Sequence, residues 1–359
     1  MKKKIRILVT GACGVTSRSV VRSLLVSMVF KDKCEFIGTD ICTLWYGVYE
    51  KLYEKVYHVP MYNDPNYRDS INSIILNEKI DLAIIIPEPE VLYWSENPFD
   101  VKFMRIPPKF ARTVLSKKNL YEELRKTDLT PKYQIIKKDL NLKNTEELKL
   151  EFPCWIRDYS EGTTSGKGSF KPHNIEELNA WLTINPDIDN FMLSEYLPGR
   201  NLACFLLYNN GVLLKYGVAE RIDYIMSKVS VSGITGNTSK GKLLNDDDVF
   251  SIAKRSIDLI VSKTKETMHG LVVVDLKENS SGKPLITEIN IRHVAFTSSF
   301  ATAGFNFSEF QLLCMLDRIY EISPELTKRF TDDNIILRDV DGLPIYIEHF
   351  KELEIGQYF

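Results

Sequence analysis

The chain has 359 residues, of which 44% are hydrophobic and 26% are charged, and its formal net charge is −2. This length exceeds that of one ordinary domain and suits two or three. A nearly neutral chain offers no broad basic field, so neither nucleic acid nor an acidic membrane surface is an expected partner. The apolar runs are too short to span a bilayer, and the six cysteines include no C-x-x-C pair. We therefore expect a cytoplasmic protein with reduced thiols, without a disulfide framework or a zinc site.

The first hundred residues alternate the signals of strands and helices. Apolar runs predict strands at 5–9, 36–38 and 82–86, and apolar residues at helical spacing predict helices at 17–29 and 66–79. This β-α-β order implies a parallel sheet with helices packed over it. The glycine turn TGACGVTSRS follows the first strand but lacks the G-x-G-x-x-G pattern of dinucleotide sites. A structural turn, or a site for a substrate anion, explains it better.

A second region starts near residue 111, and from Phe191 the pattern is α+β. We predict strands near 133–137, 153–157, 191–195, 203–208 and 212–217, and helices at 117–127, from 175, at 246–263 and at 308–320. Asn174 and Glu177 have the spacing of a capping box at the start of the second helix. The predicted units are 1–110, 111–196, 197–330 and a tail, 331–359, with a candidate strand at 343–348.

In two neighbouring predicted strands, polar side chains that could bind a ligand interrupt or alternate with apolar ones. The stretch PLITEINIR directs Glu288, Asn290 and Arg292 to one face, because residues i, i+2 and i+4 of a strand point the same way. The preceding strand carries one carboxylate, Asp275, and the turn-forming residues 278–284 favour a hairpin between the two. Two carboxylates and an amide oxygen are ligands that Mg²⁺ takes when phosphates also hold it. The hairpin therefore predicts a magnesium–nucleotide site; a solvated strand face is the alternative.

Other segments carry groups suited to phosphate. The loop RDYSEGTTSGKGSF, residues 157–170, offers N–H groups and hydroxyls that can fold over a polyphosphate, with a plain surface loop as the alternative. Arg157 ends the strand that precedes this loop. Lys117 begins a predicted helix, where a cation opposes the helix dipole and indicates a nearby anion.

In this order the features resemble the ATP-grasp superfamily over residues 3–320. The resemblance is greatest to the synthetase units of the carbamoyl-phosphate synthase large chain and related carboxylate–amine ligases, and EINIR against E-x-N-P-R is its strongest part. It implies an ATP-grasp fold with an N-terminal Rossmann-like pre-ATP-grasp domain, 1–110. An N-lobe with the glycine loop, 111–196, and a C-lobe with the metal site, 197–330, would follow. ATP and Mg²⁺ are the implied cofactors.

The resemblance also implies roles for single residues. The positions that match the nucleotide site are Lys117, Arg157, Ser165, Gly166, Gly168, Glu195, Tyr196 and Leu197. Asp275, Glu288 and Asn290 fall on the metal-ligand positions, and Arg292 on the arginine that steadies the transferred phosphate. Substrate candidates are Glu88 and Glu90, which follow the carboxyl end of a parallel strand and suit an amine, and His293 beside Arg292.

Three positions depart from the family pattern. Leu202 stands where a second ribose acid is expected, Ile291 replaces the proline, and Ala295 replaces an arginine that binds carboxyphosphate in carbamoyl-phosphate synthases. We therefore predict a carboxylate–amine ligase that forms an acyl phosphate from small-molecule substrates, with a homodimer left open. The alternatives are an ATP-binding sensor or assembly subunit without ligase activity, and a true synthetase of carboxyphosphate or carbamoyl phosphate.

Overall fold

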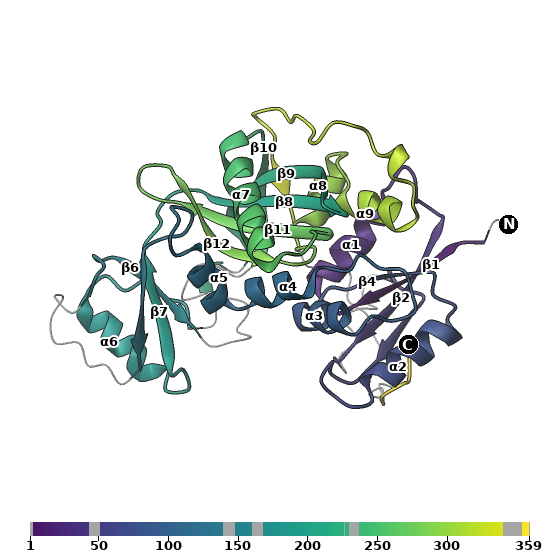
Figure 1. Ribbon diagram of the computed structural model, residues 1–359, viewed down its shortest axis with the longest axis horizontal. Coiled ribbons are helices and arrows are strands. Elements are labelled where there is room, and N and C mark those ends of the chain that lie inside the picture. The colour runs from purple at the N-terminus through teal and green to yellow at the C-terminus, as the bar shows by residue number, and fades with distance from the viewer. Residues whose placement is uncertain are drawn as a thin grey trace.

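A computed structural model describes residues 3–42, 51–138, 148–159, 168–225, 227–229, 237–339 and 354–358 of the chain. These residues contain three sheets of four, six and three strands, and Figure 1 shows the largest between the other two. A parallel unit followed by antiparallel sheets confirms the predicted combination of α/β and α+β. Within this part of the chain, no helix has the length and hydropathy needed to cross a membrane.

The N-terminal sheet is parallel, with the order β3-β2-β1-β4. Its strands are β1 (Ile5–Thr10), β2 (Cys34–Asp40), β3 (Lys55–His58) and β4 (Leu82–Ile84), and its helices are α1 (Val15–Leu25), α2 (Tyr67–Asn77) and α3 (Glu88–Glu96). The predicted parallel sheet is thus confirmed. The strand β3 was not predicted, because four residues are too few to show a period of two.

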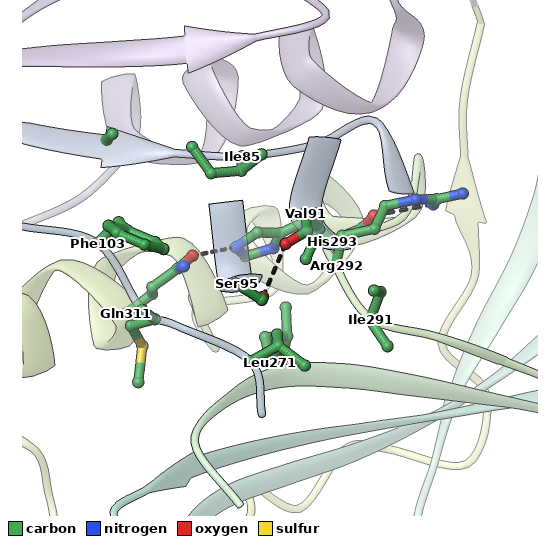
Figure 2. Close-up of a pocket in the computed structure, with 12 residues that line it drawn as sticks. Ile85, Val91, Ser95, Phe103, Leu271, Ile291, Arg292, His293 and Gln311 are labelled. Atoms are coloured by element: carbon green, nitrogen blue, oxygen red, sulfur yellow. Dashed lines mark hydrogen bonds between the residues drawn. The ribbon is translucent and has the colours of Figure 1, made fainter. Parts of the chain in front are cut away.

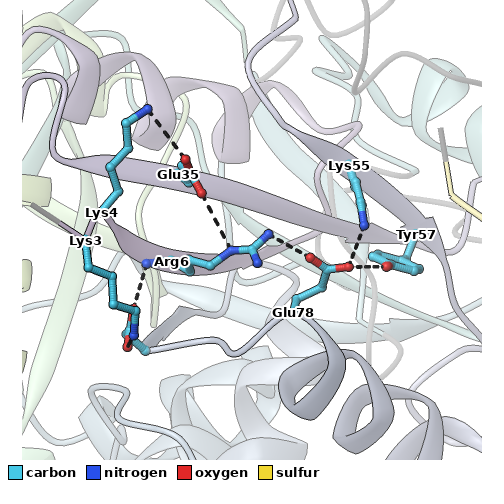
Figure 3. Close-up of polar contacts among 8 residues, drawn as sticks. Lys3, Lys4, Arg6, Glu35, Lys55, Tyr57 and Glu78 are labelled. Carbon is cyan, nitrogen blue, oxygen red and sulfur yellow. Dashed lines mark hydrogen bonds and ion pairs between the residues drawn. The ribbon is translucent and has the colours of Figure 1, made fainter. Parts of the chain in front are cut away.

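A buried carboxylate, Glu78, joins the strands β1 and β3 of this sheet to the end of α2 (Figure 3). Its oxygens accept hydrogen bonds from Arg6 Nη2 at 2.7 Å, Lys55 Nζ at 2.8 Å and the Tyr57 hydroxyl at 2.5 Å. Burial raises the pKa of Glu78, but the bonds from Lys55 and Tyr57 and the charges of Lys55 and Arg6 outweigh it, so the pKa is lowered overall. The C-terminal residues 354–358 lie on the same edge, where Lys55 Nζ is 4.3 Å from the centre of the Tyr358 ring.

We expect Glu78→Gln to lower the free energy of unfolding by about 1–3 kcal/mol at neutral pH, since Arg6 and Lys55 lose their shared acceptor charge. The folded pKa lies below the unfolded one, so this contribution is present above the unfolded pKa and is lost as pH falls through the folded pKa. Urea unfolding should show the difference from wild type at neutral pH and its loss in acid. A difference that does not change with pH would contradict the assignment.

Two helices and a three-stranded antiparallel sheet follow, with the strand order β5-β7-β6. The elements are α4 (Pro108–Leu115), α5 (Lys117–Leu124), β5 (Tyr133–Lys137), β6 (Cys154–Asp158), α6 (Ile175–Ile184) and β7 (Asn190–Glu195). The predicted capping box is present at α6. Asn174 accepts from Glu177 N at 2.8 Å, and the Glu177 carboxylate accepts from His173 N at 2.9 Å. The helix α4 was not predicted.

The six-stranded sheet is antiparallel, with the order β12-β11-β8-β9-β10-β13. Its strands are β8 (Asn201–Asn209), β9 (Val212–Tyr224), β10 (Thr238–Leu244), β11 (Gly270–Glu278), β12 (Pro284–Asn290) and β13 (Ile336–Leu337). The helices of this part of the chain are α7 (Asp247–Thr264), α8 (Thr297–Thr302) and α9 (Phe307–Met315). Two 3-10 turns, η3 (Ser227–Val229) and η4 (Ile319–Glu321), complete it. One face packs in a core with α4 and α7, and the other packs with α1, α8 and α9. The candidate strand at 343–348 lies outside the described residues.

Candidate active site

The predicted hairpin is formed by β11 and β12, and a bulge sets which side chains face together. Leu276 lies opposite Ile286, a register that would place Glu288 opposite Val274 and on the far face. The extra residue, Thr287, shifts the register so that Asp275 lies opposite Glu288. Asp275, Glu288 and Asn290 therefore share one face of the sheet, as the alternation predicted.

The two carboxylates of this face differ in their partners. The Asp275 carboxylate accepts hydrogen bonds from Arg221 Nη1 at 3.0 Å and Nη2 at 2.6 Å, and both side chains are largely buried. Asn290 Nδ2 approaches the same carboxylate at 3.5 Å. Glu288 accepts no hydrogen bond from the residues that the structure describes. Its carboxylate is therefore the one with open coordination.

Two cations come to this face from the three-stranded sheet and its helices. Lys117 is the first residue of α5; burial lowers its pKa, and the nearby charges of Glu288 and Glu88 oppose that shift. Arg157 is the last but one residue of β6, and it donates to the Tyr121 hydroxyl at 2.8 Å and to the Thr287 carbonyl at 3.3 Å. The bulge therefore also positions Arg157, because it turns the Thr287 carbonyl toward the guanidinium.

Glu88, from the N-terminal unit, lies beside Arg292, which follows β12, near the carboxylates of this face. Arg292 Nε lies 3.6 Å from Glu88 Oε1, and Arg292 Nη1 donates to the His293 carbonyl at 2.9 Å. Burial raises the pKa of Glu88, Arg292 and Lys117 lower it, and Glu288 and Asp275 raise it again. Glu88 is thus a buried acid that faces the predicted metal and phosphate residues. The PEPE segment is no solvated loop, because Glu88 begins the helix α3.

Glu90 does not join this cluster. Residues two apart on a helix point to different sides, and Glu90 instead faces Thr10 and Tyr67 inside the N-terminal unit. Its burial raises its pKa to about 7, with hydrogen bonds from Thr10 and Tyr67 opposing the shift. The structure therefore does not bring Glu88 and Glu90 together, because the helix α3 directs them to different groups.

The ring of His293 is also turned away from the cluster (Figure 2). It is 1% exposed and contacts Gln311 Oε1 through Nε2 and Thr297 Oγ1 through Nδ1. Burial lowers its pKa to about 4, so the ring is neutral. It lines a small cavity of about 20 Å³, enough for a single water molecule, rather than a substrate site.

Of the remaining nucleotide candidates, Glu195, Tyr196 and Leu197 lie where β7 ends. Glu195 N donates to the Lys132 carbonyl at 3.0 Å, and its carboxylate accepts from Lys132 N at 2.9 Å. Lys171 Nζ lies 3.9 Å from the centre of the Tyr196 ring, and Leu197 is buried. Gly168 has φ +66° and anchors the end of the glycine loop at the Trp181 indole, which donates to its carbonyl. Ser165 and Gly166 lie outside the described residues.

Sequence reasoning missed Arg221, although it contacts a predicted metal ligand. The two residues are 54 positions apart, and their strands β9 and β11 are separated by β8. The guanidinium crosses β8 at Ala203, which lies opposite Asp275 and is small enough to leave room. The stretch VAERIDY gave no clear signal, because Arg221 stands there beside two other charged residues, Glu220 and Asp223.

Neither a protein-family model nor a curated protein sequence matches the chain. Several solved structures share its fold. The N5-carboxyaminoimidazole synthetase of Staphylococcus aureus, complexed with ADP, has a TM-score of 0.62 at 13% identity, with 94% of this chain and 81% of that chain covered. The L-amino acid ligase of Bacillus licheniformis has a TM-score of 0.59 at 14% identity, with 90% and 78% covered.

The D-alanine–D-alanine ligase of Bacillus anthracis, complexed with ATP, has a TM-score of 0.53 at 16% identity, with 89% of this chain and 97% of that chain covered. Identities this low establish a common fold and no more. The common fold agrees with the arrangement of sheets described above and with the resemblance to the ATP-grasp superfamily that the EINIR motif carries. The chain therefore has the fold of the ATP-grasp superfamily.

Proposed function

We propose that the chain is an ATP- and Mg²⁺-dependent ligase that joins a carboxylate to an amine through an acyl phosphate. The observation that carries the proposal is the convergence of Lys117, Glu88 and Arg292 on the open carboxylate of Glu288, from three separate parts of the chain. The fold of the ATP-grasp ligases supports it. A binding protein without catalysis needs no arginine beside the proposed metal ligands.

The donor set of the hairpin fits a magnesium ion. Glu288 has an open carboxylate, and Asn290 has an amide oxygen on the same face. Asp275 is the third proposed ligand, and its oxygens are shared with Arg221. When bound, the ion offsets charge on the phosphates.

The chain's own residues carry the rest of the proposed mechanism. Lys117 and Arg157 bind the phosphates of ATP between the lobes 111–196 and 197–330, and Arg292 stabilises the charge on the transferred phosphoryl group. The substrate carboxylate attacks the γ-phosphorus, ADP leaves, and an acyl phosphate forms. The amine then attacks the acyl carbon, the C–N bond forms, the bond from that carbon to the bridging oxygen breaks, and phosphate leaves with this oxygen. Glu88, whose pKa is raised, accepts the proton from the amine.

The carboxylate that we propose is an organic acid and not bicarbonate. Ala295 offers no cation at the position where carbamoyl-phosphate synthases bind carboxyphosphate, and its carbonyl accepts from Ser19 Oγ at 3.0 Å. The residues after it form α8, which packs against α1 and carries no charged side chain: its buried residues are Thr297, Ser299, Phe300 and Ala301.

The proposal predicts that a suitable carboxylate stimulates ADP formation from Mg-ATP and that an amine is needed for full turnover. A panel of amino acids and short peptides, crossed with amines, measures this against bicarbonate, which alone should give no stimulation. Strong turnover with bicarbonate and formation of carbamoyl phosphate would favour the synthetase alternative. ATP binding by calorimetry without turnover by any pair would favour the sensor alternative.

A further inference from the structure

The glycine turn TGACG, which the proposed mechanism does not use, brings a cysteine to the carboxyl end of the parallel sheet. The strands β1 and β2 are parallel neighbours (Figure 1), and Ala12 N continues their pairing by donating to the Thr39 carbonyl at 3.0 Å. Gly11 turns the chain here with φ +62°, a left-handed value that suits glycine. Cys13 therefore follows β1 at the same edge of the sheet where β2 ends at Asp40.

The carboxylate of Asp40 binds the backbones of two cysteines. Its Oδ2 accepts from Cys13 N at 2.8 Å, and its Oδ1 accepts from Cys42 N at 2.8 Å. The two thiol sulfurs and a carboxylate oxygen of Asp40 all lie within 4.8 Å of one another. The structure holds both cysteines as thiols and not as a disulfide, and all three residues are half-buried. An ion can therefore reach the three ligand atoms from solvent.

The hydrogen bonds of the turn account for the carboxylate but not for the thiols. Both bonds come from backbone N–H groups, which any residue other than proline supplies. Each carboxylate oxygen has a second lone pair, so Asp40 can accept these bonds and also bind a metal ion. Hydrogen bonds of this kind orient the ligands of metal sites. The two sulfurs and the oxygen thus form a set of three ligands whose carboxylate is already oriented.

The two sulfurs restrict the class of ion. Thiolates bind borderline or soft ions such as Zn²⁺, whereas Mg²⁺ and Ca²⁺ take oxygen ligands. Zinc sites are tetrahedral and accept both Cys and Asp, and a site with three protein ligands keeps its fourth position for a water molecule. The β11–β12 hairpin offers oxygen ligands from Glu288 and Asn290, so the two sites should select different ions.

We propose that Cys13, Asp40 and Cys42 bind a zinc ion at the carboxyl end of β1 and β2. When one Zn²⁺ binds, each thiol releases its proton to solvent, and two thiolates and a carboxylate then ligate the ion. This site goes beyond the proposed ligase function and does not depend on it. Local spacing predicted no zinc site, because Cys13 and Asp40 are 27 positions apart and only the pairing of β1 with β2 brings them together.

Cobalt substitution tests the ligands directly, since tetrahedral Co²⁺ bound by thiolates shows sulfur-to-cobalt charge-transfer absorption. Under a phosphine reductant, the wild-type chain should bind Co²⁺ with this absorption, and Zn²⁺ but not Mg²⁺ should displace it. Loss of an outer partner of a metal ligand costs about 10–100-fold in affinity, so Cys13→Ser and Cys42→Ser, which remove ligands, should each weaken Zn²⁺ binding at least about 100-fold. Cys34→Ser is the matched control, because Cys34 is also half-buried but begins β2 at the opposite edge of the sheet. It should bind Zn²⁺ as the wild type does.

Alkylation of the wild-type chain tests the site without a substitution that could disturb the turn. Iodoacetamide modifies thiols, and peptide mass spectrometry measures each cysteine separately. Zn²⁺ should slow the alkylation of Cys13 and Cys42, and EDTA should restore it. Cys34, whose pKa burial raises to about 11, should react slowly and at the same rate with and without Zn²⁺. Unchanged alkylation of Cys13 and Cys42 by Zn²⁺, or Co²⁺ bound by the wild type without charge-transfer absorption, would overturn the site. Neither result depends on ATP turnover.

Discussion

Glu288→Gln should remove ATP turnover and leave the fold intact. The carboxylate of Glu288 has no hydrogen-bond partner in the described residues, and removing its charge opens no apolar cavity, so unfolding in urea should change by less than about 1 kcal/mol. The charge faces Lys117 and the Glu88–Arg292 pair, and it is the open ligand of the proposed metal site. We expect the rate of ADP formation to fall by on the order of 10²-fold or more. The Mg²⁺ dependence of nucleotide binding, measured by calorimetry, should weaken as well.

A carboxylate on the neighbouring strand gives the matched control. Glu278 accepts from Arg200 Nε at 2.9 Å and from Arg200 N at 3.0 Å, outside the cluster of Glu288. Glu278→Gln should therefore reduce stability more than turnover, the reverse of Glu288→Gln. Asn290→Ala should follow Glu288→Gln. Near-normal turnover of Glu288→Gln, or a chain that no longer folds, would refute the metal assignment.

The sequence predicted which side chains of β12 share a face, because the period of a strand is short and local. Glu288 and Asn290 lie two positions apart within β12 and must share a face, whereas Arg292 lies beyond the end of the strand, where alternation does not place it. The bulge at Thr287 was not visible in the sequence, although it brings Glu288 opposite Asp275. Alternation along one strand therefore predicted the face, and pairing between strands decided the register.

The substrate candidates were predicted less well, because their positions depend on where elements begin and end. No helix was predicted after the strand that ends in PEPE, yet proline is favoured in the first turn of a helix, and α3 begins at Glu88. This helix separates Glu88 from Glu90. His293 follows Arg292 in sequence, but β12 has ended at Asn290, so alternation no longer applies and the ring turns inward.

The contacts of Arg221 and Cys13 are long-range, and no local pattern predicts them. Arg221 needs the small residue Ala203 on the strand between it and Asp275. Cys13 needs the parallel pairing of β1 with β2, which brings it to Asp40. Such contacts are set by the order of strands in the sheet, which the alternation of a single strand does not contain.

Arg292→Gln should have the second large effect, on turnover and on stability together. It removes the cation that we propose for the transferred phosphate, so ADP formation should fall by on the order of 10²-fold. It also leaves Glu88 without a countercharge 3.6 Å away. Breaking such a pair should cost about 1–3 kcal/mol at neutral pH, less than for a fully buried pair, since the Arg292 side chain is 22% exposed.

The pH dependence and a double variant separate these two effects. The folded pKa of Glu88 is already raised, and loss of Arg292 raises it further, so the stability deficit of Arg292→Gln should be absent below the unfolded pKa of glutamate and grow as pH rises to neutral. Adding Glu88→Gln removes the buried carboxylate and should restore most of the stability at neutral pH. Turnover should stay low in the double variant, because the cation is still missing. Urea unfolding across pH, with ADP formation in parallel, measures both; a double variant that regains turnover would show that Arg292 acts only by balancing Glu88.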